Sequence, residues 1–162
     1  MQVALISDTH IPSRASGFPG WVREAIETSD HLIHAGDFDS PRTHFDQRVL
    51  AGGSFTGVVG NMDPSLGLPE VATVDRGGVR FVVTHGDGFG RGEPYRRALA
   101  DLASEYEADV AVGGHTHRLT DAVVDGVRIL NPGSATGAAP AEYPSLITVE
   151  CDNGTFRVRH LE

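Results

Sequence analysis

The stretch Leu5-Ile6-Ser7-Asp8-Thr9-His10 determines how the rest of this chain is read. Residues 3–6 form a short apolar run with the β-branched character of a buried strand. The run ends in an acid, a hydroxyl and an imidazole, and in open α/β sheets chemistry gathers just beyond the carboxyl ends of strands. Asp8 and His10 lie two residues apart, so at a strand end both point to the same side, where a carboxylate and an imidazole suit a divalent metal. A lone D-x-H pattern is common by chance, so the case depends on what later strands add.

The first half of the chain alternates strands with helices. Further apolar strands are expected at 31–35 and 55–59. Helices are expected at 21–28 and 41–50, the second with Ser40 as its N-cap and a proline at its first position. This rhythm predicts parallel strand–helix–strand units whose carboxyl ends are aligned.

The second half of the chain has a different pattern, in which hairpins predominate. Residues 70–75 and 79–84 flank Arg76-Gly77-Gly78, which is typical of a hairpin. A helix at 94–106 and a strand at 110–112 follow, and residues 121–162 read as antiparallel hairpins. The pattern predicts an α/β fold in one domain spanning 1–162: a four-layer αββα sandwich of two packed mixed β-sheets with helices outside.

Polar side chains of the metal-ligand type follow each of five predicted strands. Seven nitrogen and oxygen ligands are too many for one tetrahedral zinc, but they suit two ions of five- or six-coordinate geometry that share a bridging ligand. The bridge has to be a carboxylate, and Asp37, alone at its strand end, is the natural candidate. The seven are Asp8, His10, Asp37, Asn61, His85, His115 and His117.

These residues resemble those of the calcineurin-like metallophosphoesterases. The likeness is closest to the compact bacterial and archaeal phosphodiesterase branch, which is similar in fold to the retromer subunit of eukaryotes. It covers nearly the whole chain, and five ordered blocks are far more specific than any one of them. The blocks are D-x-H (Asp8, His10), G-D (Gly36, Asp37), G-N (Gly60, Asn61), H-G (His85, Gly86) and G-H-T-H (Gly114 to His117).

The resemblance implies a site of two divalent ions, with Mn²⁺ the first choice and Zn²⁺, Fe, Ni²⁺ or Co²⁺ as alternatives. A hydroxide bridging the two ions would attack a phosphate ester, so the implied activity is that of a phosphodiesterase or phosphatase. Asp37, Asn61, His85 and His115 are assigned to catalysis. One ion would be held by Asp8, His10 and His117 and the other by Asn61, His85 and His115, with Asp37 bridging both.

One departure from the family pattern concerns the leaving group. Larger members carry a histidine after the G-N asparagine that is thought to protonate it, and here that position is Met62, which donates no proton. General acid catalysis is typically worth 10²–10⁴-fold, so lower activity on poor leaving groups is expected. Asp63 is the nearest other acid, but an Asp before Pro in a turn favours a structural role.

Several other polar residues have more than one possible role. Arg14, in the loop after the first strand, is predicted to reach substrate phosphate, although a loop salt bridge fits as well. Asn61 and Ser134 are also assigned to substrate binding. For Asn131 and Ser134, orienting a ligand histidine and a plain turn are the alternatives. His34 is expected in the core. The remaining histidines, His31, His44 and His160, have no motif context and are expected at the surface.

The charge of the chain restricts its partners. The formal net charge is −9, and all 13 basic residues are arginine. Such a surface disfavours binding to nucleic acid or to anionic membranes, which leaves a small phosphate ester as the partner and a homo-oligomer as an open question. Acid excess without lysine resembles the proteins of salt-adapted archaea, and a GC-rich genome is the alternative cause.

The remaining features concern location and the competing function. Cys151 is the only cysteine, so no internal disulfide forms, and no signal peptide or membrane span is visible, which predicts a cytoplasmic protein. The alternative to an enzyme is a catalytically weak protein-binding scaffold on the same fold, as in the retromer branch. Seven intact ligands favour the enzyme.

Overall fold

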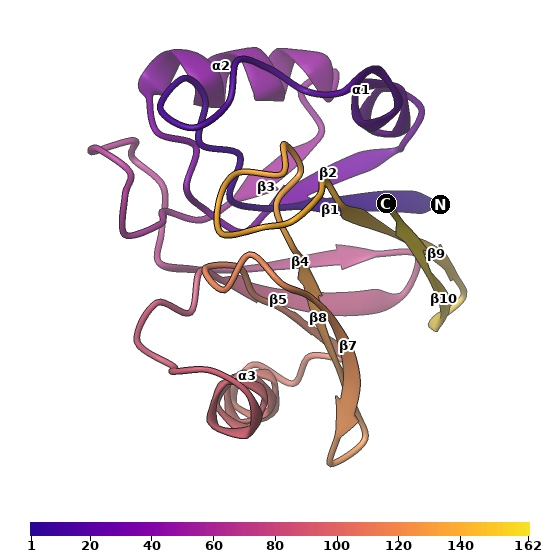
Figure 1. Cartoon of the computed structure of the whole chain (residues 1–162). Coiled ribbons are helices and arrows are strands. Elements are labelled where there is room, and N and C mark those ends of the chain that lie inside the picture. Colours follow the sequence, from indigo (N-terminus) through magenta and orange to yellow (C-terminus); the bar gives the residue numbers. More distant parts are fainter.

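The fold consists of two five-stranded sheets lying face to face between layers of helices (Figure 1). The computed structural model describes residues 1–162. The first sheet has the order β10 (Thr155–Leu161), β9 (Leu146–Asp152), β1 (Gln2–Ile6), β2 (His31–His34) and β3 (Phe55–Gly57). The second has the order β4 (Val71–Arg76), β5 (Val79–Thr84), β6 (Val110–Val112), β8 (Val127–Pro132) and β7 (Leu119–Val124).

Both sheets are mixed, as predicted. In the first, β1, β2 and β3 run parallel and β9 and β10 add an antiparallel hairpin. In the second, β5, β6 and β8 run parallel, with β4 and β7 antiparallel at the two edges. The carboxyl ends of the parallel strands therefore come together at one edge of each sheet.

Three helices cover the outer faces (Figure 1). Helices α1 (Gly20–Glu27) and α2 (Pro41–Leu50) lie over the first sheet, and α3 (Glu93–Glu105) lies over the second. The predicted N-cap is correct, because the Ser40 hydroxyl accepts a hydrogen bond from the Thr43 N–H at 3.1 Å. None of the three helices has the length and the apolar character needed to cross a membrane.

The apolar run in β1 serves two cores at once. Val3 and Leu5 face the second sheet and join the largest cluster of buried side chains. Ala4 and Ile6 point the other way, into a cluster with Val22 of α1. Alternation along a strand sends successive side chains to opposite faces, so a continuous apolar run is what a strand covered on both sides requires.

The histidines outside the ligand motifs differ in how far they are buried. His34 is fully buried, as predicted, and its ring stacks on Phe38. His160 is exposed, whereas His44 is partly buried. The surface prediction for His31 is wrong: the side chain is 2 % exposed, because hydroxyl groups on the next strand and its loop bond both ring nitrogens.

Candidate metal centre

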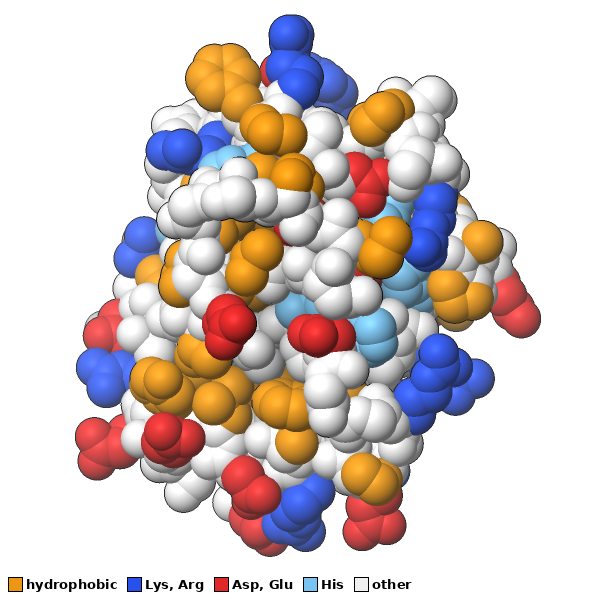
Figure 2. Space-filling model, turned by 90° about the vertical axis from the view of Figure 1, so that its left-hand side faces the viewer, with side chains coloured by type: hydrophobic (Ala, Val, Ile, Leu, Met, Phe, Trp, Pro, Cys, Tyr) orange, Lys and Arg blue, Asp and Glu red, His pale blue; other side chains and the backbone are white.

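The predicted ligands lie on loops at the edge where parallel strands of both sheets end. Figure 2 shows histidine side chains exposed in a hollow on this side of the molecule. Asp8, His10, Asp37 and Asn61 come from loops after β1, β2 and β3, and His85, His115 and His117 come from loops after β5 and β6. The chain thus brings all seven together from two sheets.

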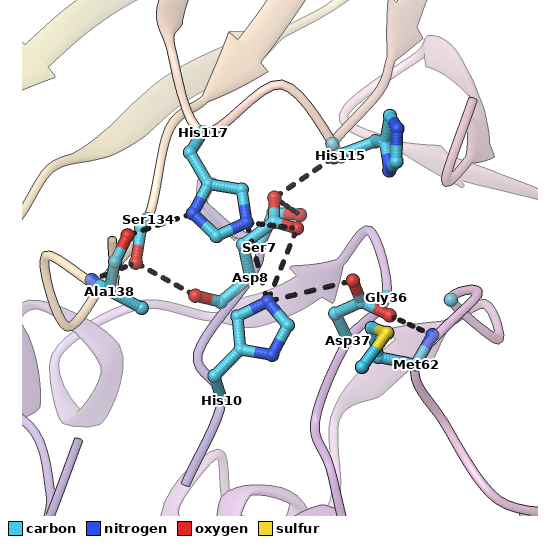
Figure 3. Close-up of polar contacts among 12 residues, drawn as sticks. Ser7, Asp8, His10, Gly36, Asp37, Met62, His115, His117, Ser134 and Ala138 are labelled. Carbon is cyan, nitrogen blue, oxygen red and sulfur yellow. Dashed lines mark hydrogen bonds and ion pairs between the residues drawn. The ribbon is translucent and has the colours of Figure 1, made fainter. Parts of the chain in front are cut away.

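One group of candidate ligands consists of Asp8, His10 and His117. All three side chains are buried, and they point toward one another from separate loops (Figure 3). The Asp8 Oδ1 atom lies 3.3 Å from Nε2 of His117 and 3.9 Å from Nε2 of His10. The two Nε2 atoms are 3.3 Å apart. These three atoms enclose a space suited to one cation.

A second group consists of Asp8, Asp37 and His85. The Nε2 atom of His85 is 3.1 Å from Oδ2 of Asp37 and 4.0 Å from Oδ1 of Asp8. The same Asp37 oxygen is 3.6 Å from Nε2 of His10, so it faces histidines of both groups. Asp8 belongs to both groups as well, and the bridging role of Asp37 therefore stays a prediction.

Asn61 and His115 extend the second group toward solvent. The Asn61 side-chain oxygen lies 2.9 Å from Nε2 of His85 and 3.2 Å from Nδ1 of His115. Asn61 is exposed and His115 half-buried, in contrast to the other five ligands. These two side chains form the solvent-facing rim of the centre.

The tautomers of three histidines are fixed by their outer neighbours. The Nδ1–H groups of His117 and His85 donate to the carbonyl oxygens of Ala138 and Ala35 at 2.8 and 2.7 Å. The Nδ1–H of His10 donates to the Asp39 carboxylate at 2.8 Å. Partners of this kind commonly orient metal-binding histidines, since a ring that donates from Nδ1 presents the lone pair of Nε2 inward when neutral.

Hydrogen-bond acceptors therefore face one another at the centre of the cluster. The Nε2 lone pairs of His10 and His117 point at the same space, and Oδ1 of Asp8 is buried there without any hydrogen-bond partner. A buried carboxylate oxygen left unpaired is costly, and a cation relieves it. Nitrogen and oxygen donors of this kind suit first-row divalent metals, so the residues present fit such an ion.

The cluster also shifts the pKa values of its histidines. Burial works against the charged form of His85, but the hydrogen bond to Asp37 and the charge of Asp8 outweigh it and raise the pKa to about 9. Burial likewise opposes the charge on His117, and Asp8 raises the pKa of that ring. Carboxylates thus give this centre a strong preference for positive charge, which a proton or a metal ion satisfies.

The backbone of the centre is held in an unusual conformation. Five of the seven candidate ligands have positive φ, a region that costs about 1–3 kcal/mol for residues other than glycine and clusters at functional sites. Glycine is required beside them: a Cβ at Gly60 would lie 2.1 Å from Oδ1 of Asp37. The five are Asp8 (51°), His10 (45°), Asp37 (65°), His115 (70°) and His117 (56°).

Asp63 has the structural role that its turn context favours. Its two carboxylate oxygens accept hydrogen bonds from four backbone N–H groups at 2.7–3.0 Å. Three of the donors are consecutive residues, 37–39, and the fourth is Gly60. This one side chain therefore ties the loop of Asp37 to the loop of Asn61, and its acceptor capacity is used up.

The predicted substrate-binding residues differ in accessibility. Arg14 is exposed and donates one hydrogen bond to the carbonyl of Ala139 at 2.9 Å. Ser134 is fully buried, and its hydroxyl donates to the carbonyl of Asp8 at 2.7 Å. Met62, at the position of the missing histidine, is 53 % exposed.

Two residues that support the centre were missed by the sequence analysis. Asp39 orients His10, and the only signal for it is a second acid two positions after Asp37. Tyr95, buried at the start of α3, donates from its hydroxyl to the carbonyl of Gly114 at 2.7 Å. No local pattern pairs these two positions, because their contact depends on how α3 packs against the second sheet.

Comparison with known proteins places this geometry in context. A family model described as the calcineurin-like phosphoesterase superfamily domain matches residues 1–154. A probable metallophosphoesterase of Methanothermobacter thermautotrophicus is 34 % identical over 154 residues, which are 94 % of this chain and 87 % of the relative.

Solved structures with the same fold include Vps29 of Entamoeba histolytica complexed with zinc, at a TM-score of 0.81 and 27 % identity, covering 99 % of this chain and 98 % of that one. A structure described as a novel archaeal phosphodiesterase has a TM-score of 0.74 at 23 % identity and covers 99 % of this chain and 100 % of that one. At that identity the second likeness concerns the fold alone.

Proposed function

The chain belongs to the calcineurin-like phosphoesterase superfamily, and on that premise we propose that it is a metal-dependent phosphodiesterase of small phosphate esters that uses two divalent ions. The whole chain, 1–162, would form its single catalytic domain. One observation carries the proposal: the unpartnered Oδ1 of Asp8 lies among the inward-facing Nε2 atoms of three histidines. Such an arrangement favours a positive charge among these atoms, and a divalent ion bound there would be suited to catalysis.

The proposed ligand sets follow the two groups of the cluster. Asp8, His10 and His117 would hold one ion, Asn61, His85 and His115 the other, and Asp37 both. Support for the shared role of Asp37 is the position of its Oδ2 atom, 3.6 Å from His10 and 3.1 Å from His85. When bound, two such ions supply an acidified water for attack on phosphorus and positive charge for the phosphate oxygens.

The chain itself contributes orientation. Asp39 and the carbonyls of Ala35 and Ala138 hold three imidazoles with Nε2 inward, so these ligands need no rearrangement during the reaction. The exposed amide of Asn61 and the exposed guanidinium of Arg14 retain N–H groups that would donate to phosphate oxygens.

Of the roles expected for Ser134, we propose that of orienting a ligand histidine. Its buried hydroxyl donates to the Asp8 carbonyl and accepts from the Ala138 N–H at 2.8 Å. It thereby links the loop that carries Asp8 to the carbonyl that orients His117.

Neither residue 62 nor residue 63 supplies a proton to the leaving group. Met62 donates no proton from its side chain, and both oxygens of Asp63 are engaged with backbone N–H groups. Without a general acid, esters that leave as stable anions, such as aryl esters, would be cleaved fastest.

The test compares two aryl esters with and without metal. The protein is chelated in high KCl, Mn²⁺ is added back, and hydrolysis of bis(p-nitrophenyl) phosphate and p-nitrophenyl phosphate is followed. Metal-restored cleavage of the diester in excess of the monoester is expected. A chelated protein that remains fully active would refute the metal dependence.

A variant pair tests the shared ligand. Asp37→Asn should lose both bound metal, measured by mass spectrometry, and activity. Asp87→Asn removes the same charge from an exposed position two residues after His85 and should retain both. Full metal content in Asp37→Asn would exclude the bridging role.

A second candidate function rests on the structural likeness to Vps29. A protein-binding scaffold on this fold needs no catalysis, and Vps29 of Entamoeba histolytica shares the fold at a TM-score of 0.81. No turnover of either ester by folded, metal-loaded protein would favour this candidate.

A further inference from the structure

A hollow lies beside the metal centre, since His117 is among the residues that line it. It has a volume of about 350 Å³ and reaches from His117 to the start of α3. Three arginines line it, Arg91, Arg96 and Arg118, together with Tyr143. In Figure 2, basic side chains lie next to the exposed histidines. The candidate metal centre thus opens onto a basic surface.

None of these three arginines is neutralised by an ion pair with a carboxylate. Five arginines elsewhere pair with carboxylates. Arg91, Arg96 and Arg118 have no carboxylate within 4.0 Å, although the chain carries 22 acidic residues. One acid, Glu142, lines the hollow, so three guanidiniums and one carboxylate leave it with an excess of two positive charges.

The wall of the hollow is anchored to the metal centre. Tyr95, which is 2 % exposed and lines the hollow, donates to the Gly114 carbonyl and accepts from the Asn131 amide at 2.9 Å. The same amide donates to Thr116 Oγ1 at 3.0 Å. The helix that carries Arg96 is therefore fixed against the loop of His115 and His117, and Arg118 follows that loop directly.

We propose that this hollow binds a second phosphate group on one ester arm of the substrate. The inference rests on the proposed function and names its substrate class: a diester with a phosphate-bearing arm. Two excess positive charges match a phosphate dianion, and guanidinium forks match its oxygens. The volume exceeds that of a phosphate, and the 46 % exposed ring of Tyr143 offers a stacking face for a planar group on the same arm, as in a nucleotide.

The kinetic test uses two diesters that differ by one phosphate. These are the p-nitrophenyl ester of thymidine 5′-phosphate and the same ester carrying a 3′-phosphate. The wild-type kcat/KM should be at least about tenfold higher for the 3′-phosphorylated ester, since several arginines each contribute up to about fivefold in an exposed site. Arg96→Gln and Arg118→Gln should each remove several-fold of this preference and change cleavage of the plain ester less than twofold.

Arg97→Gln is the matched control. Arg97 follows Arg96 on α3 but pairs with Asp125 and lies outside the hollow, so the preference should survive. A wild-type preference below twofold, or an equal loss in Arg97→Gln and Arg96→Gln, overturns the proposal.

A binding measurement separates this proposal from the proposed function. Titration calorimetry of chelated and Mn²⁺-loaded protein compares thymidine 3′,5′-bisphosphate with thymidine 5′-phosphate. If wild-type protein hydrolyses neither diester, the proposed function fails. Tighter binding of the bisphosphate that disappears in Arg96→Gln and Arg118→Gln still supports the hollow. Equal affinity for both nucleotides overturns it.

Discussion

Replacing Asp63 with Asn tests whether a single side chain positions the metal-binding loops. Its Oδ1 atom accepts from the N–H groups of Phe38 and Asp39, and its Oδ2 atom accepts from those of Asp37 and Gly60. An amide keeps one acceptor oxygen and places an NH₂ group where the other oxygen was. Two of the four hydrogen bonds are therefore lost. The new NH₂ group also faces the two backbone N–H groups that had bonded the replaced oxygen.

The magnitude follows from the number of hydrogen bonds. A bond to a charged group contributes about 1.5–3 kcal/mol when buried, and about 1 kcal/mol is reasonable for a half-buried carboxylate such as Asp63. Asp63→Asn should thus lower the free energy of unfolding by about 2 kcal/mol, and Asp63→Ala by about 3–4 kcal/mol. Because Asp63 orients the backbone of Asp37 and the loop of Asn61, metal affinity should fall about 10–100-fold.

Urea unfolding and metal titration measure the two effects. A loss of about 2 kcal/mol moves the midpoint by about 1 M for an m-value near 2 kcal/mol/M. Asp101→Asn, which removes the same charge from the exposed side of α3, should change neither quantity. Wild-type stability and wild-type metal affinity in Asp63→Asn would refute the positioning role.

Three further predictions follow from features of the core and the surface. Gly60→Ala should cost about 2–3 kcal/mol and abolish metal binding in calorimetry, because its Cβ would lie 2.4 Å from the Asp37 nitrogen; wild-type binding would contradict this. Burial, assisted by Arg76, lowers the pKa of His31 to about 4, so the unfolded state binds more protons and stability should fall by about 1–2 kcal/mol from pH 6.5 to pH 5. Thermal unfolding should show a smaller fall in His31→Gln. Because the net charge is −9, the melting temperature should also rise between low and molar KCl, and an unchanged value would exclude salt adaptation.

The clustering of the candidate ligands could be predicted from sequence because of the way parallel strands are arranged. Each apolar run ends at the same edge of its sheet, so an Asp, Asn or His that directly follows a run is placed by the fold class alone. This reasoning brought Asp8, His10 and Asp37 together without knowledge of any distance. It also separated His34, inside a run, from His85, after one.

What sequence reasoning missed depends on contacts across elements. His31 is buried because hydroxyls of Ser54 and Thr56 bond its ring and Arg76 reaches it from the other sheet. Ser134 is buried because its loop turns back beneath Asp8. Neither contact has a local pattern, since partners tens of residues apart in sequence become neighbours only when strands and loops pack.

The division of the ligands between two sheets has a thermodynamic consequence. Residues before position 62 supply four of the proposed ligands and residues after position 84 supply three, so neither part of the chain holds a complete site. An unfolded chain cannot bind the ions in this way, and binding is therefore coupled to folding. At a free metal concentration of 100 times Kd, the coupling adds about 2.7 kcal/mol to stability. Loading the proposed centre with metal should therefore raise the free energy of unfolding, an effect that can be measured without any substrate.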